Sequence, residues 1–443
     1  MLFKVENRWE PLSSGNELEG EIDAIANNAV VVEGLCREIN QRMGRTSMWE
    51  LPAANNSVYP ESPGVLGIGI LKFKGATFRG HRGEKTGPST REYRRINPHL
   101  GFDNRTGDFI PVLSKVCPEG GITVERARSE VWHAFNNTLN DCPSASPVAL
   151  YVSDDPSMRF VCEDQNSPLA VAVTGLPRDG RGRFDELLTN LRDGQLTQED
   201  EEKLKSLGLD NSATLPETLA ALSGKTGETM FAFHHRANSC RYSGYPNNLG
   251  YTKEQDGKVF LTDLDTSVQL SNFPEKIVSL QMIRDLSSLL YGTISWCLQR
   301  ENISHFEDDD CEWFDNLMRG YHPGIDESVL ADLKGIFLRH YRGFVEFAVE
   351  QHSNIGDEPV DKTCVDFQTF RKKTRTQYWI ERKKVYMLAM SIMWTMNMHS
   401  ELNKIAPLQF DPDHLFRNVP RYSEDPELGE LVKTEFGRLL RGA

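Results

Sequence analysis

One stretch in the middle of the chain carries an amide and a carboxylate at one end of a predicted β-hairpin. Residues 245–251 and 259–267 have the composition of short strands, and the turn between them, residues 253–257, ends in Asp-Gly. Asp-Gly between apolar runs is a strong local signal for a hairpin. Because the strands of a hairpin are antiparallel, we expect Asn248 before the first strand and Asp263 after the second to lie side by side.

Amide and carboxylate oxygens at such a place suit a magnesium ion that bridges nucleotide phosphates. This ion takes one or two carboxylates from a protein and completes its octahedron with water and substrate oxygens. The hairpin therefore predicts a nucleotide-dependent transferase.

A second stretch could supply positive charge. Residues 64–76 read as a glycine-punctuated strand in which apolar residues alternate with Lys72 and Lys74. The backbone at Gly67 and Gly69 could approach a phosphate closely, and a lysine on the same strand could add a point charge. An ordinary edge strand with solvent-exposed lysines has the same pattern.

A basic loop and a predicted helix start follow this strand. The loop, residues 79–85, begins with Arg79, and residues 87–95 contain a Ser-Thr pair that could cap a helix. Glu92 would then lie in the first turn, where a carboxylate interacts favourably with the helix dipole. It could instead pair with Lys74 and hold the ammonium group in place.

The rest of the chain divides into a strand-rich part and a helical part. Short Val-rich and Leu-rich runs predict strands at 108–116, 146–153, 158–162 and 169–174, and helical periodicity predicts helices at 13–43 and 123–139. The loop 175–183 would serve as a hinge. After it the pattern is helical apart from the hairpin, at 184–191, 197–207, 217–222, 274–300, 327–351, 367–405 and 428–440. The fold class is therefore α+β.

Composition narrows the class of protein. The chain has 443 residues, of which 39% are hydrophobic and 26% charged, as in ordinary soluble globular proteins of two or three domains. The formal net charge of −14 argues against general nucleic-acid affinity, which needs a cationic surface. The most apolar run, residues 385–398, is too short to span a bilayer, so no membrane partner is expected.

The cysteines indicate a reducing compartment. The eight cysteines are widely scattered and form no CxxC pair, which predicts reduced thiols rather than a disulfide framework or a zinc site. Residues 1–8 lack the apolar core of a signal peptide. We therefore expect a cytoplasmic protein.

The order of these elements resembles the protein-kinase-like superfamily, a two-lobed ATP-binding fold. Within it, residues 71–77 and 89–93 are similar to the selenoprotein-O pseudokinase family, in which a strand ending in Lys-Gly-Ala is followed by a basic, glycine-containing loop and a Ser-x-Arg-Glu helix start. The resemblance covers residues 60–300 in outline. It implies a helical extension at 1–60, a β-rich N-lobe at 61–176 and a helical C-lobe at 177–443 that carries the hairpin 245–267.

The resemblance also assigns roles on the lysine side of the site. Lys74 would bind the phosphates of ATP, with Lys72 as the alternative, and Glu92 would orient that lysine. The glycine strand, through Gly67 and Gly69, and Arg79 of the basic loop would complete the nucleotide site.

On the metal side, Asp263 would be the main Mg²⁺ ligand. Asn248 would bind the metal as well, with Asn247 as the second choice. Asp265 falls where kinase-like proteins usually have a glycine. It would be a second metal ligand, or the true ligand with Asp263 as its neighbour.

One departure from the kinase pattern concerns the general base. Kinases place an aspartate five residues before the metal-binding asparagine, where it accepts the proton of the substrate hydroxyl. Ser243 stands there in this chain, or Tyr242 if Asn247 is the ligand. The chain could thus be a kinase with a histidine or another unconventional base, an AMP transferase like the resembled family, or a non-catalytic nucleotide binder.

Other candidate sites are weaker. Adjacent His234 and His235 would diverge on either a helix or a strand, so they make a poor zinc pair. The acidic run 306–310 lacks the alternating ligands of an EF-hand. We predict an ATP- and Mg²⁺-dependent transferase that moves a phosphoryl or adenylyl group to a hydroxyl of a protein, peptide or small molecule. The alternative is an inactive kinase-like nucleotide-binding or scaffold protein.

Overall fold

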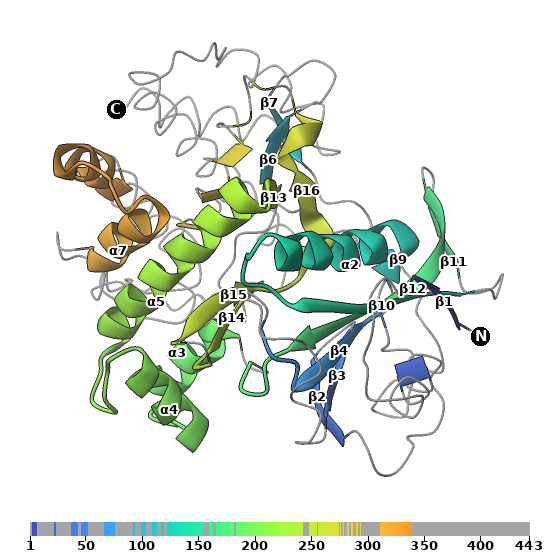
Figure 1. Ribbon diagram of the computed structural model, residues 1–443, viewed down its shortest axis with the longest axis horizontal. Helices are drawn as coiled ribbons and strands as arrows, with labels where there is room; N and C mark the ends of the chain where they lie inside the picture. The colour runs from blue at the N-terminus through green and yellow to red at the C-terminus, as the bar shows by residue number, and fades with distance from the viewer. Residues whose placement is uncertain are drawn as a thin grey trace, which may run out of the picture.

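The structure of the chain is a computed structural model (Figure 1). It describes residues 2–6, 22–23, 37–42, 46–51, 66–75, 92–93, 99–102, 109–112, 117–118, 122–153, 159–162, 165–180, 183–241, 248–254, 256–273, 311–335 and 337–338, together with scattered residues between 275 and 293.

An eight-stranded antiparallel sheet dominates the first part of the described chain (Figure 1). Its main path runs in the order β1-β10-β12-β4-β3-β2, and β9 and β11 pair with β12 outside that path. The strands are β1 Leu2–Glu6, β2 Arg37–Arg42, β3 Thr46–Glu50, β4 Ile70–Lys74, β9 Ile122–Thr123, β10 Ser146–Ser153, β11 Arg159–Cys162 and β12 Gln165–Leu176. Because β4 lies between β12 and β3, its backbone is hydrogen-bonded on both sides and its side chains are held in fixed directions.

Two short antiparallel pairs lie outside this sheet. β5 Glu92–Tyr93 pairs with β8 Cys117–Pro118, and β6 His99–Phe102 pairs with β7 Phe109–Val112.

The two faces of β4 point to different surroundings because side chains alternate along a strand. Leu71 and Phe73 join an apolar cluster with Val171 and Val173 of β12 on one face. The other face of the sheet carries the side chains between them, and the long helix α2 Val124–Leu139 lies across that face (Figure 1).

Helix α2 is held on the sheet by its apolar side. Ala127 and Val131, four residues apart, pack with Leu150 of β10 and with Ala170 and Ala172 of β12. This spacing is the one expected for a single helix face. Any polar residue on the same face of α2 is therefore directed at the sheet.

The second part of the described chain is mainly helical. It contains α3 Phe184–Arg192, α4 Gln198–Ser206, α5 Leu215–Phe231, the π-helix η2 Ala232–Arg236 and α7 Glu312–Tyr321. The hairpin of β14 Leu249–Thr252 and β15 Lys258–Leu261 lies among them, and β13 Ser239–Arg241 pairs with β16 Ser267–Gln269. The 3-10 turns η4 Leu264–Thr266 and η5 Leu270–Asn272 flank β16.

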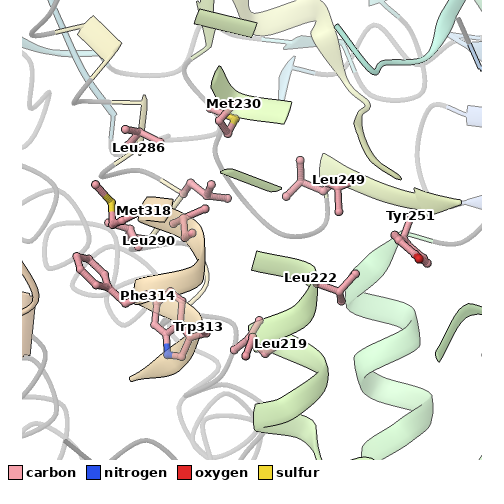
Figure 2. Packing of buried hydrophobic residues seen from close by; sticks show 14 of the residues in the cluster. Leu219, Leu222, Met230, Leu249, Tyr251, Leu286, Leu290, Trp313, Phe314 and Met318 are labelled. Atoms are coloured by element: carbon pink, nitrogen blue, oxygen red, sulfur yellow. The ribbon is translucent and has the colours of Figure 1, made fainter. Parts of the chain in front are cut away.

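One hydrophobic core joins the hairpin to these helices. Leu249 and Tyr251 of β14 belong to one cluster with Leu219 and Leu222 of α5 and with Phe314 of α7 (Figure 2). Helices α5 and α7 approach closely because glycines meet there. A Cβ atom at Gly227 would come within 2.2 Å of the carbonyl oxygen of Leu317.

The starts of α4 and α5 follow from local sequence. Thr197 and Thr214 each accept a hydrogen bond from the backbone N–H three residues later. The carboxylates of Asp200 and Glu217 each accept one from the backbone N–H of the threonine. These are capping boxes, which satisfy backbone N–H groups that a helix start leaves without partners. Pro216 near the start of α5 is also favourable, since its missing N–H is not needed there.

Several sequence predictions are confirmed. The hairpin forms with the predicted turn, the glycine-punctuated strand contains β4, and α2, α3 and α4 match the helices predicted at 123–139, 184–191 and 197–207. The strands predicted at 108–116, 146–153, 158–162 and 169–174 correspond to β7, β10, β11 and β12. The mixed α+β character follows from these elements.

Other predictions are wrong. Residues Arg37–Arg42, placed in a helix over 13–43, form β2, and residues 2–6 and 46–50 form strands of the same sheet. Glu92–Tyr93, placed in a helix start, form β5. Helix α5 extends nine residues past the predicted end at 222, and α7 was not predicted.

Some predictions fall outside the described residues. These are the helices at 367–405 and 428–440 and parts of those at 274–300 and 327–351. The division of the chain at residues 60 and 176 stays a prediction. Among the helices that the structure describes, none combines the length and the apolar character that a membrane span requires.

Candidate functional site

Two lysines of β4 are buried beneath α2. Lys72 and Lys74 are 1% and 2% exposed, and their backbones pair with Thr174 and Ala172 of β12. Burying an ammonium group costs several kcal/mol unless anionic partners surround it. The position of these two side chains therefore depends on carboxylates from elsewhere in the chain.

The first such carboxylate is Glu130 of α2. Its side chain is fully buried, with Oε1 3.4 Å from Lys72 Nζ and Oε2 3.0 Å from Lys74 Nζ. Glu130 follows Ala127 by three residues, so it lies on the same helix face that packs on the sheet. One carboxylate thus holds both lysines.

Two more carboxylates arrive from the end of the hairpin. Asp263 Oδ1 is 2.9 Å from Lys72 Nζ and 3.2 Å from Lys74 Nζ. Asp265 Oδ1 is 2.8 Å from Lys74 Nζ, and its Oδ2 is 3.3 Å from Arg126 Nη1 of α2.

The backbone at Asp263 makes this arrangement possible. Asp263 has a φ of 55°, in the left-handed region that aspartate tolerates better than most residues. The chain turns there from β15 into η4. Asp263 and Asp265 consequently both reach the lysines of β4.

An arginine from the segment after β12 completes the group. Arg183 Nη2 donates to Asp263 Oδ2 at 3.0 Å, and its Nη1 donates to Asn248 Oδ1 at 3.2 Å. The predicted amide ligand and the predicted carboxylate ligand therefore face one common cation.

We call these seven charged side chains the ion cluster. They are Lys72, Lys74, Arg126, Glu130, Arg183, Asp263 and Asp265. Among the residues that the structure describes, the ion cluster joins four cations to three carboxylates, a balance that suits an anionic ligand.

The ion cluster has a buried side and a solvent-facing side. Lys72, Lys74, Glu130 and Asp265 are almost wholly buried, whereas the side chains of Asp263, Arg126 and Arg183 are 21%, 19% and 17% exposed. Burial would raise the pKa of Asp263, but the charges of Lys72, Lys74 and Arg183 outweigh that effect and hold its pKa well below the usual range. Asp263 is therefore ionised at neutral pH and faces the side that solvent reaches.

A second buried network fixes the backbone beneath the hairpin. The guanidinium of Arg241 donates from Nη1 to the carbonyl oxygens of Asn248 at 3.2 Å and Thr262 at 3.4 Å. Asp285 Oδ2 accepts from the backbone N–H of Arg241 at 2.8 Å and contacts His234 Nε2 at 3.2 Å. Arg241 thus positions the residues that carry Asn248 and Asp263.

A third contact anchors the hairpin turn. Asp179, just after β12, accepts from Thr252 Oγ1 at 2.6 Å and from the backbone N–H of Lys253 at 2.7 Å. The segment that leads from the sheet to Arg183 is therefore tied to the hairpin that carries Asn248.

The donor set fits a nucleotide-bound magnesium ion. Within the part of the chain that the structure describes, no three His, Cys, Asp or Glu side chains form a metal-binding group of their own. Magnesium held between nucleotide phosphates needs only one or two protein carboxylates, because phosphate and water oxygens supply the rest. Asn248 Oδ1 and Asp263 Oδ2 meet that need, since they already share one cation, the guanidinium of Arg183.

The other predicted site residues fall in different places. A Cβ at Gly69 would lie 2.7 Å from the Cα of Arg178, and one at Gly67 would lie 3.2 Å from Glu254 Oε2. These glycines thus allow close packing of the chain on itself. Glu92 belongs to β5, and its predicted pairing with Lys74 stays a prediction because its side chain is outside what the structure describes. Glu130 is a described carboxylate partner of Lys74. Arg79 and Asn247 lie outside the described residues.

Sequence reasoning missed three members of the ion cluster: Arg126, Glu130 and Arg183. Glu130 had a usable signal, because an acidic residue stands on the apolar face of the helix between Ala127 and Ala134. A charge in that position needs a buried partner. Arg126 and Arg183 had no comparable local signal.

Comparisons with known proteins give little beyond this geometry. No protein-family profile matches the chain, and no curated protein matches it. A solved structure described as the ROP18 kinase domain in complex with AMP-PNP and sucrose is similar over 89% of this chain and 93% of that chain, with 10% sequence identity and a TM-score of 0.32. A likeness of that degree carries no argument about fold or ligand.

Proposed function

We propose that this protein is a kinase-like, nucleotide-binding transferase that uses ATP and Mg²⁺. The observation that carries the proposal is the ion cluster: two buried lysines of a central strand, held by a glutamate of the covering helix and by an aspartate that follows a hairpin. Protein kinases hold nucleotide phosphates with a related set, namely one strand lysine paired with a glutamate of a helix and an aspartate that binds the metal.

Each member would act on a different part of the nucleotide. The lysine ammonium would bind phosphate oxygens, and Glu130 would keep it oriented. Asn248 and Asp263 would hold the metal ion, which when bound neutralises phosphate charge and orients the phosphates. An acceptor hydroxyl would then attack in line, with the rate coming mainly from positioning and electrostatic stabilisation.

Of the two lysines, we assign the phosphate to Lys72. Lys74 contacts three carboxylates at 2.8–3.2 Å, whereas Lys72 contacts Asp263 at 2.9 Å and Glu130 only at 3.4 Å. Lys74 is the more completely neutralised and serves to hold Asp265 and Glu130. Lys72 loses less when a phosphate replaces one of its partners.

The transferred group is tested with ATP labelled at either phosphate. Label from γ-phosphate in an acceptor identifies a phosphotransferase, and label from α-phosphate identifies an AMP transferase. Asp263→Ala is the variant to compare with the parent protein, because it removes the carboxylate that contacts Lys72 and shares Arg183 with Asn248. If Asp263→Ala binds Mg·ATP as tightly as the parent protein, the assignment of the site is wrong.

A second candidate is an inactive kinase-like protein that binds nucleotide or serves as a scaffold. It is favoured by the completeness of the ion cluster, in which Glu130, Asp263 and Asp265 each contact cations through both carboxylate oxygens. Nucleotide-dependent stabilisation without transfer of either label supports this candidate over the transferase.

A further inference from the structure

Arg183 occupies the position that the proposed metal site requires. Its two terminal nitrogens donate separately, Nη1 to Asn248 Oδ1 at 3.2 Å and Nη2 to Asp263 Oδ2 at 3.0 Å. A planar guanidinium can bridge two acceptors in this way only when both point to the same place. The oxygens that would bind a divalent ion are therefore already turned toward one positive charge.

The backbone of Arg183 is anchored near this point by contacts on both sides. It forms a β-bridge with Gly250 of β14, and its carbonyl accepts from the backbone N–H of Glu186 at 2.9 Å as α3 begins. Its side chain makes no capping bond to α3. The side chain can thus leave the two oxygens without breaking the start of the helix.

A metal ion and this guanidinium would compete for the same two oxygens. A divalent ion needs the lone pairs of Asn248 Oδ1 and Asp263 Oδ2 directed at itself, and the guanidinium already takes a lone pair from each oxygen and repels a second cation beside it. The carboxylate also has its other oxygen, Oδ1, within 3.2 Å of both lysines. Both oxygens of Asp263 are therefore already engaged by cations while Arg183 is bound, which weakens the binding of a metal.

Arg126 provides an internal comparison. It too is an arginine of the ion cluster, with a similar exposed fraction of 19%, but it contacts Asp265 Oδ2 at 3.3 Å. Removing Arg126 changes the net charge of the ion cluster by the same amount as removing Arg183. It leaves the Asn248–Asp263 pair bridged.

We propose that Arg183 competes with a divalent cation for Asn248 and Asp263 and so keeps the metal site closed until the guanidinium moves away. This inference rests on the proposed function, since it concerns the same metal site. It adds that the nucleotide-free protein binds a divalent ion weakly because its own arginine fills the site.

The test measures binding of Mn²⁺ alone to the full chain, without nucleotide, by electron paramagnetic resonance of the free ion. Arg183→Met removes the competing charge and keeps an apolar stem, so we expect the Mn²⁺ affinity to rise roughly tenfold to a hundredfold, in line with the loss of charged hydrogen bonds. Arg126→Met is the charge-matched control and is expected to raise it less than about threefold through general electrostatics.

Two further variants locate the bound ion and control for misfolding of Arg183→Met. Arg183→Met combined with Asp263→Asn is expected to lose the gained affinity, which locates the ion at Asp263. Arg183→Lys keeps a charge but cannot bridge both oxygens, so it is expected to give an intermediate affinity even if the methionine variant folds poorly. Thermal unfolding of each variant shows whether it is folded.

Three results would overturn the inference: an unchanged Mn²⁺ affinity in Arg183→Met, an equal rise in Arg126→Met, or a gained site that survives Asp263→Asn. Failure of the proposed function looks different. In that case the parent protein and Arg183→Met both fail to bind ATP with or without metal, whatever their affinity for Mn²⁺.

Discussion

The network around Arg241 and the ion cluster differ in what their side chains contact. The network of Arg241, Asp285 and His234 is at most 1% exposed, and Arg241 and Asp285 in it bind backbone groups. The ion cluster consists of contacts between side chains, and three of its members reach solvent. Side-chain partners can be exchanged for a ligand, whereas backbone partners cannot be lost without local unfolding. The first network is thus a support and the second a candidate site.

The largest expected effect comes from breaking the supporting network. Asp285→Asn removes the negative charge near Arg241, whose pKa burial already lowers while Asp285 opposes that effect. Removing one charge from a buried network of opposite charges is expected to cost up to ~3–5 kcal/mol, the range for a broken buried ion pair, because the charge that remains is left buried with less compensation. We expect the free energy of unfolding, measured by urea denaturation, to fall by about this amount.

The control for that experiment is an exposed ion pair. Arg319 and Glu327 lie 3.0 Å apart on the surface, and Arg319→Met is expected to leave the urea midpoint essentially unchanged. If Asp285→Asn is as stable as Arg319→Met, the network does not support the hairpin and the contrast between the two networks fails.

A smaller effect separates the two lysines of the ion cluster. Lys74→Met leaves Asp265 and Glu130 each with one fewer cation, so we expect a loss of ~2 kcal/mol in stability. Lys72→Met is expected to cost about half as much, because its contact with Glu130 is the longer one. The order reverses for ATP, whose affinity we expect to fall roughly tenfold or more in Lys72→Met, the loss of one charged hydrogen bond.

Denaturation curves and calorimetric ATP titrations on the two variants check this reversal. Should Lys74→Met weaken ATP more than Lys72→Met at equal stability, the roles of the two lysines are exchanged. Equal losses of ATP affinity in Lys72→Met and Lys74→Met would mean that the two lysines contribute equally to phosphate binding.

Elements whose structure depends on interactions between neighbouring residues could be predicted from the sequence, and those that depend on distant residues could not. The hairpin was predictable because Asp256 and Gly257 both adopt positive φ in the turn, which Asp-Gly encodes locally. The strand β4 and helix α2 were predictable from their own periodicities. Each of these signals lies within a single turn, strand or helix.

The wrong predictions concern segments whose structure depends on residues far away in the sequence. Arg37–Arg42 are mostly polar and form the last strand of the sheet path, so pairing with β3 and not their own pattern makes them a strand. The partner of the buried lysines is also distant, because helix α2 brings Glu130 from 56 residues beyond Lys74. No spacing rule within the chain predicts a partner at that distance.

The smallest predicted effect concerns His133, which lies between the two networks. It is on α2, one turn after Glu130, and its Nδ1 is 3.4 Å from Ser239 Oγ of β13, the strand that ends in Arg241. Burial lowers the pKa of His133 to about 4, partly offset by a hydrogen bond with the backbone of Ser267. The imidazole is therefore neutral in the folded protein, while in the unfolded chain it takes up a proton near pH 6.5.

A folded-state pKa below the unfolded one means that acid favours unfolding. The contribution of His133 is fully present above about pH 6.5 and is lost as the pH falls toward 4, with a loss of roughly 1 kcal/mol between pH 7 and pH 5.5. His133→Asn is expected to flatten this part of the stability profile, measured by urea denaturation at each pH. Asp263 does not contribute in this range, because its depressed pKa confines its effect to pH values below about 4. If the free energy of unfolding of His133→Asn still falls between pH 7 and pH 5.5, a group other than His133 causes the loss of stability.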